Sequence, residues 1–100
     1  MFIYKISPKE EYKLFISKGY TEGSMADKEE GFIHLSTRTQ LYDTINKHFS
    51  NLKILFISSF FINPMDTNLK WEISRNSEFF PHYYGILYMK DRIYSIRIQN

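Results

Sequence analysis

The feature that most constrains the fold is an apolar run in the second half of the chain. Residues 53–60 read KILFISSF and are nearly continuous in apolar side chains. This pattern is typical of a central strand that is covered on both of its faces. The chain has 100 residues, which is enough for one domain, so we expect residues 1–100 to fold around this strand as a single unit.

The segments on either side predict an α+β fold. Ser7 and Glu10 form a capping box around Pro8, and Gly19 is placed to close the helix that follows. A second box, Thr37 with Gln40, predicts another helix that ends near residues 48–49. Further strands are predicted at residues 2–6, 32–36, 69–74, 84–89 and 93–98. Helices early and strands late predict a curved mixed, largely antiparallel sheet with two helices in the N-terminal half.

Composition excludes several classes of protein. There are no cysteines, so disulfide scaffolds and thiol catalysis are ruled out. The net charge is only +2 and the basic residues are dispersed, so we expect no binding to duplex nucleic acid. No signal peptide or membrane-spanning run is recognisable, so we expect a cytoplasmic protein with no membrane partner. A protein partner is left undetermined.

The most informative segment for function is GFIHLST, residues 31–37. In a strand, His34 and Ser36 point to one face and can serve one ligand. Thr37 begins a helix, whose free N–H groups suit an anion such as phosphate. The alternative is structural: His34 donates to a backbone carbonyl, while Ser36 and Thr37 only cap. The preceding residues 20–31 are predicted to form a long polar loop that closes over a ligand.

A second candidate segment lies around residues 70–85. Lys70, Glu72 and Ser74 share a strand face, and Arg75 follows the strand end, where it could grip phosphate or carboxylate. A surface ion pair between Lys70 and Glu72 is the structural alternative. Trp71 is expected in the core.

The chain's histidines do not predict a metal site. Their spacings along the sequence match no compact ligand motif, so no metal is predicted. His82 lies in a predicted loop, where it either faces solvent or joins a cleft.

These segments together resemble a known family. GFIHLST, the stretch KWE with Ser74 and Arg75, and FPH followed by Tyr84 and Gly85 occur in the order typical of domain of unknown function 952. The resemblance covers almost the whole chain. It also implies a likeness to the ADP-ribosyltransferase-like superfamily, in which a split, curved sheet holds NAD in a cleft.

The resemblance implies particular roles for the candidate residues. His34 matches the early-strand position that binds the ribose and adenosine side, with Ser36 and Thr37 beside it. Tyr84 or Phe80 would stack on nicotinamide, and Arg75 would meet pyrophosphate. Glu72 would hold the ribose 2′-OH, although residues 84–100 contain no glutamate.

Three functions therefore stay open. The first is a protein that binds a nucleotide or ADP-ribose-like ligand such as NAD, with ADP-ribosyl or phosphoryl transfer as its reaction. The second is a non-catalytic module that binds another small anionic ligand or a protein. The third is a hydrolase with His34 or His82 as general base.

Overall fold

The computed structural model describes the whole chain except the side chain of Arg75. The main elements are β1 (Phe2–Pro8), α1 (Lys9–Lys18), β2 (Tyr20–Thr21), α2 (Met25–Glu30), β3 (Ile33–His34), α3 (Leu41–His48), β4 (Ile54–Phe61), β5 (Leu69–Ile73), β6 (Phe79–Tyr83), β7 (Leu87–Tyr88) and β8 (Arg92–Gln99). Short 3-10 turns occur at η1 (Arg38–Gln40), η2 (Arg75–Ser77) and η3 (Met89–Asp91). The predicted α+β class is confirmed. No helix in the described part of the chain is long and apolar enough to cross a membrane.

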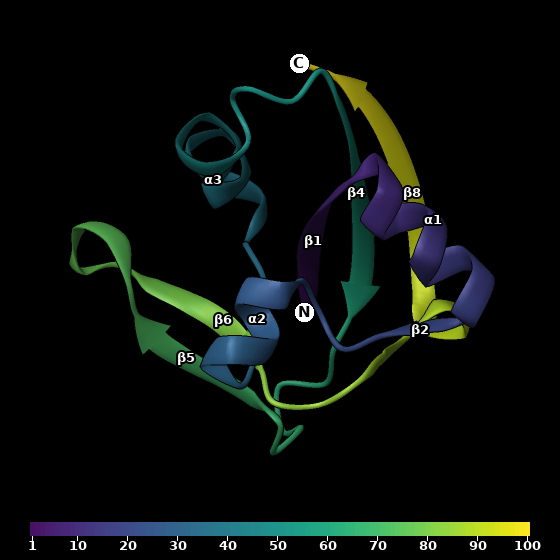
Figure 1. Cartoon of the computed structure of the whole chain (residues 1–100). Helices are drawn as coiled ribbons and strands as arrows, with labels where there is room; N and C mark the ends of the chain where they lie inside the picture. The colour runs from purple at the N-terminus through teal and green to yellow at the C-terminus, as the bar shows by residue number, and fades with distance from the viewer.

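The strands form antiparallel sheets rather than one mixed sheet. The first sheet has the order β1-β4-β8, the second has the order β3-β6-β5, and β2 pairs with β7. Figure 1 shows the β5–β6 hairpin projecting as an arm away from β1, β4 and β8. The prediction of a single sheet was wrong because strand pairing depends on contacts far apart in sequence, which periodicity does not encode.

The apolar run at residues 53–60 does form the central strand of the first sheet. β4 lies between β1 and β8, and its Leu55 and Phe60 are buried. Ile3 pairs with Phe60 on the face that α1 covers through Tyr12 and Phe15. The main core is therefore built on this sheet face and α1, and it extends to Ile33, Leu69 and Leu87 of β3, β5 and β7.

The first helix begins later than its sequence pattern predicted. Ser7 is buried within β1, where it pairs with Phe56, and Pro8 stands at the N-cap with extended dihedrals. The predicted capping box of Ser7 was wrong because the strand continues to Pro8 and keeps this serine in the sheet. Gly19 closes the helix as predicted, with φ of 81° and its N–H donating to the Phe15 carbonyl at 2.9 Å.

Residues 20–31 are not a polar loop. They contain β2 and the helix α2, which begins at a capping box between Ser24 and Asp27 and ends at Gly31 with φ of 92°. The prediction of a loop was wrong because α2 is too short and too polar to show helical periodicity. Its caps stabilise it instead.

The strand assignments after residue 74 were also partly wrong. The predicted loop around residues 75–82 contains β6, which pairs with β5 as a hairpin, whereas only Leu87–Tyr88 of the predicted strand 84–89 is extended and paired. Trp71 is 37% exposed rather than a core residue. Its strand β5 is at the edge of the second sheet, where less of each face is covered.

Neighbouring phenylalanines at the end of β4 test this account of the core. Phe60→Ala should lower the free energy of unfolding by about 3–5 kcal/mol, because it leaves a cavity at a side chain that is 2% exposed. Phe61→Ala is the matched control, since Phe61 is 57% exposed and should cost about 1 kcal/mol or less. Urea unfolding of both variants measures the difference. An equal loss in free energy of unfolding in Phe60→Ala and Phe61→Ala would contradict the assignment of Phe60 to the core face.

Candidate functional site

Two histidines lie opposite each other on the second sheet. β3 and β6 pair so that His34 faces His82 across the ladder, and their ring centroids are 5.2 Å apart. The preceding pair, Ile33 and Tyr83, points to the other face, where Ile33 belongs to the core. The strand register therefore directs both imidazoles to the same side of the sheet.

His34 is held between two carboxylates of α2. Its Nδ1 lies 2.6 Å from Asp27 Oδ1, and its Nε2 lies 2.8 Å from Glu30 Oε2. A carboxylate oxygen only accepts hydrogen bonds, so making both contacts requires a proton on each ring nitrogen. The hydrogen bond with Asp27, together with the charges of Asp27 and Glu30, holds the pKa of His34 above its usual 6.5 despite partial burial. The site thus stabilises the imidazolium form.

The Asp27 carboxylate is fixed by two further groups. The N–H of Ser24 donates to its Oδ2 at 3.0 Å, and the buried amino group of Lys5 lies 3.8 Å from the same oxygen. A methyl group on Gly23 would come within 2.5 Å of the Asp27 side chain, so only glycine leaves room here. Burial raises the pKa of Asp27, but the hydrogen bond from His34, the charge of Lys5 and the Ser24 N–H more than offset it. The net pKa is therefore lowered.

His82 has a carboxylate partner of its own. Its Nδ1 lies 2.7 Å from Glu72 Oε1, and the hydroxyl of Tyr84 donates to both oxygens of Glu72 at 2.8 and 3.0 Å. The hydrogen bonds from His82 and Tyr84 lower the pKa of Glu72, and the bond to Glu72 raises the pKa of Tyr84. Because Glu72 only accepts, Nδ1 of His82 carries the proton and Nε2 carries the lone pair in the neutral ring.

Phe32 connects the two histidine–carboxylate pairs. Its ring stacks on His82 with centroids 4.1 Å apart and planes 22° apart, and it lies 4.7 Å from His34 and 5.2 Å from Tyr84. We call Phe32, His34, His82, Glu72 and Tyr84 the histidine cluster. Packing against Phe32 restricts the rotation of the His82 ring.

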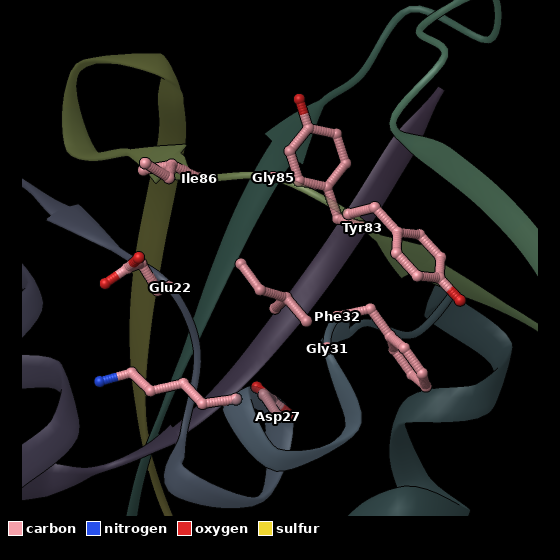
Figure 2. Close-up of a pocket in the computed structure, with 10 residues that line it drawn as sticks. Glu22, Asp27, Gly31, Phe32, Tyr83, Gly85 and Ile86 are labelled. Atoms are coloured by element: carbon pink, nitrogen blue, oxygen red, sulfur yellow. The ribbon is translucent and has the colours of Figure 1, made fainter.

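An open cavity of about 420 Å³ adjoins the histidine cluster. Phe32 and Tyr84 belong to both, and Asp27 lines the cavity as well as binding His34. Figure 2 shows that Glu22 and Ile86 contribute from the side opposite Phe32. The remaining lining residues are Lys28, Gly31, Ile33, Tyr83 and Gly85.

Only some of the candidate residues named from the sequence meet in this cluster. His34, Glu72, His82 and Tyr84 do, and Lys70 lies close, with Nζ 5.9 Å from the centre of the Tyr84 ring. Phe80 is buried opposite Glu72 in the β5–β6 ladder.

The other candidates lie elsewhere. Ser36 is buried beside Tyr4, with its hydroxyl 3.4 Å from that of Thr44. The N–H of Thr37 donates to Gln40, as its capping box predicts. Ser74 N–H donates to the Glu78 carbonyl in the turn after β5, and the side chain of Arg75 lies outside the described residues.

Reasoning from the sequence missed four residues of this region: Lys5, Asp27, Glu30 and Phe32. A local signal existed only for Asp27, which is three residues after Ser24 in the pattern of a capping box. Lys5 approaches from a different sheet, which no local pattern reveals. Among the residues described, no group of three or more histidine, aspartate or glutamate side chains is arranged to hold a metal ion.

Fold and site together define a small α+β protein whose second sheet carries paired histidine–carboxylate groups. The family described as "Protein of unknown function (DUF952)" matches residues 6–94. The chain therefore belongs to this family, which confirms the resemblance seen in its sequence motifs.

Solved structures share the fold closely. The X-ray structure of protein CC0527 from Caulobacter crescentus is 31% identical, with a TM-score of 0.90, and the match covers 100% of this chain and 94% of that one. The solution NMR structure of CC0527 is 35% identical over 95% of this chain and 82% of that one, with a TM-score of 0.84. No curated protein gives a significant match.

Adjacent glutamates of α2 test the electrostatics of His34. Glu30→Gln should lower the pKa of His34, because the charge of Glu30 contributes to raising it. Glu29→Gln is the matched control: it removes the same charge one residue away, from an exposed side chain that does not appear among the groups shifting His34. NMR titration of the His34 ring protons measures both. A change of equal size in the pKa of His34 in the two variants would contradict a specific contact between Glu30 and His34.

The raised pKa of His34 also predicts how stability depends on pH. A histidine whose pKa is higher in the folded state adds stability below its unfolded value of 6.5, and this is lost as pH rises through the folded pKa. The difference in free energy of unfolding between the natural protein and His34→Gln should therefore be largest below pH 6.5 and shrink above it. Urea unfolding from about pH 6 to about pH 9 measures this. If this difference in free energy of unfolding grew as the pH rose, it would contradict a raised pKa of His34 in the folded protein.

Proposed function

We propose that the protein binds a nucleotide or ADP-ribose-like ligand in the cavity beside the histidine cluster. The observation that carries the proposal is that Phe32 and Tyr84 belong to both the cavity and the cluster. A ligand held in the cavity would contact Phe32, whose ring packs against both imidazoles. The cavity volume of about 420 Å³ lies within the usual range for small-molecule sites.

The lining of the cavity supplies what a nucleotide needs. Phe32, Tyr83 and Tyr84 offer aromatic faces for stacking a base. Lys28 offers an ammonium group for a phosphate, and the carboxylate of Glu22 can accept hydrogen bonds from ribose hydroxyls. Apolar stacking, a cation and an acceptor in one cavity favour a nucleotide over a purely apolar ligand.

This proposal extends to the ADP-ribosyltransferase-like superfamily, with NAD or ADP-ribose as the ligand. The early-strand histidine of that resemblance is His34, and the stacking aromatic is Tyr84. Glu72 accepts hydrogen bonds from His82 and Tyr84, so it is better placed to orient His82 than to hold a ribose hydroxyl. Transfer chemistry in this protein would therefore depend on its histidines.

Titration with NAD, ADP-ribose and AMP, followed by backbone amide NMR, tests the proposal. We expect the changes in amide chemical shift to cluster on residues 31–34 and 82–86. Phe32→Leu should weaken binding about tenfold, because stacking of a base on an aromatic ring contributes about 1–3 kcal/mol. Phe79→Leu is the control, since Phe79 is an exposed aromatic that does not line the cavity.

The outcomes separate the alternatives. Binding of one or more nucleotides with loss only in Phe32→Leu supports the proposal. Absence of shifts with all three ligands would contradict it and favour a module that binds another small anion or a protein. Equal weakening in Phe32→Leu and Phe79→Leu would place the ligand elsewhere.

A further inference from the structure

We propose that His82 and His34 act as general base and general acid in the hydrolysis of a ribonucleotide phosphodiester, for which a 2′,3′-cyclic ribonucleotide serves as the probe. The inference rests on the proposed function, because the cavity beside the histidine cluster must hold the nucleoside part. It adds the substrate class and the role of each imidazole. Its basis is the geometry of the two histidine–carboxylate pairs.

The contacts of His82 suit a base. Its Nδ1–H donates a hydrogen bond to Glu72 at 2.7 Å, which leaves the Nε2 lone pair as the basic position of the neutral ring. Tyr84 fixes both oxygens of Glu72, and Phe32 stacks on the imidazole. The His82 side chain is only 7% exposed, so it is held rigidly in this tautomer and orientation.

The contacts of His34 suit an acid. Asp27, which is 6% exposed and anchored at the start of α2, binds Nδ1 and stabilises the imidazolium. Glu30 binds Nε2, but Glu30 is the last residue of α2 and its side chain is 56% exposed. A phosphate oxygen can replace this exposed carboxylate, because one anionic acceptor is exchanged for another. Nε2–H of His34 would then donate to the ligand while Asp27 stays in place.

The distance between the rings allows both to act on one phosphorus centre. Their centroids are 5.2 Å apart on one sheet face, and hydrogen bonds of about 2.8 Å from each ring can reach the attacking water and the leaving oxygen at one phosphorus. The charged and titratable groups facing the pair are Asp27 and Glu30 from α2, Lys5 from β1, Lys70 and Glu72 from β5, and Tyr84 after β6.

The proposed step balances without a cofactor. A water oxygen forms a bond to phosphorus while one proton of the water passes to Nε2 of His82. The bond from phosphorus to the 2′ or 3′ oxygen breaks, and its electron pair stays on that oxygen, which takes the proton from His34. One water is consumed and a phosphomonoester forms. Solvent then removes the proton from His82 and returns one to His34.

A phosphodiester bound through the proposed nucleotide site is a substrate that uses both groups. Its leaving group is an alkoxide, which needs a proton as the bond breaks, and its attacking water must lose one. No serine or threonine hydroxyl is hydrogen-bonded to either imidazole among the described contacts, so the geometry favours direct attack by water over a covalent intermediate.

Hydrolysis of 2′,3′-cyclic AMP by the full chain, followed by ³¹P NMR, tests the inference. We expect a phosphomonoester product and a bell-shaped dependence of kcat/KM on pH. His34→Ala and His82→Ala should each lower kcat about 100-fold or more, which is the usual contribution of a general acid or base. His34→Gln and His82→Gln provide second variants if an alanine variant does not fold.

A control and a positioning variant sharpen the test. His48→Ala removes a histidine on α3, away from the cluster, and should leave turnover unchanged. Asp27→Asn should move the alkaline limb of the pH profile to lower pH, because the hydrogen bond and charge of Asp27 raise the pKa of His34. A role for Asp27 in folding alone would lower yield or stability without moving that limb.

Binding of AMP to the same variants distinguishes failure of this inference from failure of the proposed function. If AMP binds, and 2′,3′-cyclic AMP is turned over by the natural protein but not by the two histidine variants, both the nucleotide site and the acid–base inference are supported. AMP binding without turnover, or turnover that survives both histidine substitutions, overturns the acid–base inference and leaves the nucleotide site standing. Absence of AMP binding together with absence of turnover overturns both.

Discussion

The buried carboxylate of Asp27 is the interaction on which the site depends. It contacts the Ser24 N–H, the Lys5 ammonium and the His34 ring, which come from the start of α2, from β1 and from β3. An ionised carboxylate is costly to bury unless it is paired and hydrogen-bonded, so these partners must stay assembled together. One side chain thereby joins the first sheet, the short helix and the second sheet.

The two sheets consequently contribute differently. The first sheet, with β4 at its centre and α1 over one face, buries Ile3 and Phe60 in the core and brings Lys5 to Asp27. The second sheet places His34 and His82 side by side through its register. The surroundings of the two histidines differ: Asp27 is buried and Glu72 is 40% exposed, and Glu30 adds a second carboxylate at His34. The hydrogen bond and charge of Asp27, with the charge of Glu30, raise the pKa of His34 above its ordinary value.

Much of the local structure was readable from the sequence. The apolar run at residues 53–60 predicted the central strand, and Gly19 predicted the end of α1. The Thr37–Gln40 box predicted a helix ending near residues 48–49, which in the structure is the turn η1 followed by α3. Prediction failed where local signals were weak. α2 has few apolar residues and depends on its caps, while β6 lies in a segment that looked irregular because proline interrupts it.

The sequence by itself determined the α+β class and the family, and it predicted the segments around His34 and His82 as candidate sites. Each of these is written in local patterns: side-chain periodicity, capping residues and short motifs. Only the tertiary structure decided that the two histidines face each other, that Asp27 and Glu72 are their partners and that Phe32 lies between them. These facts depend on strand register and on contacts between distant segments, and a one-residue change in register would turn the histidines to opposite faces.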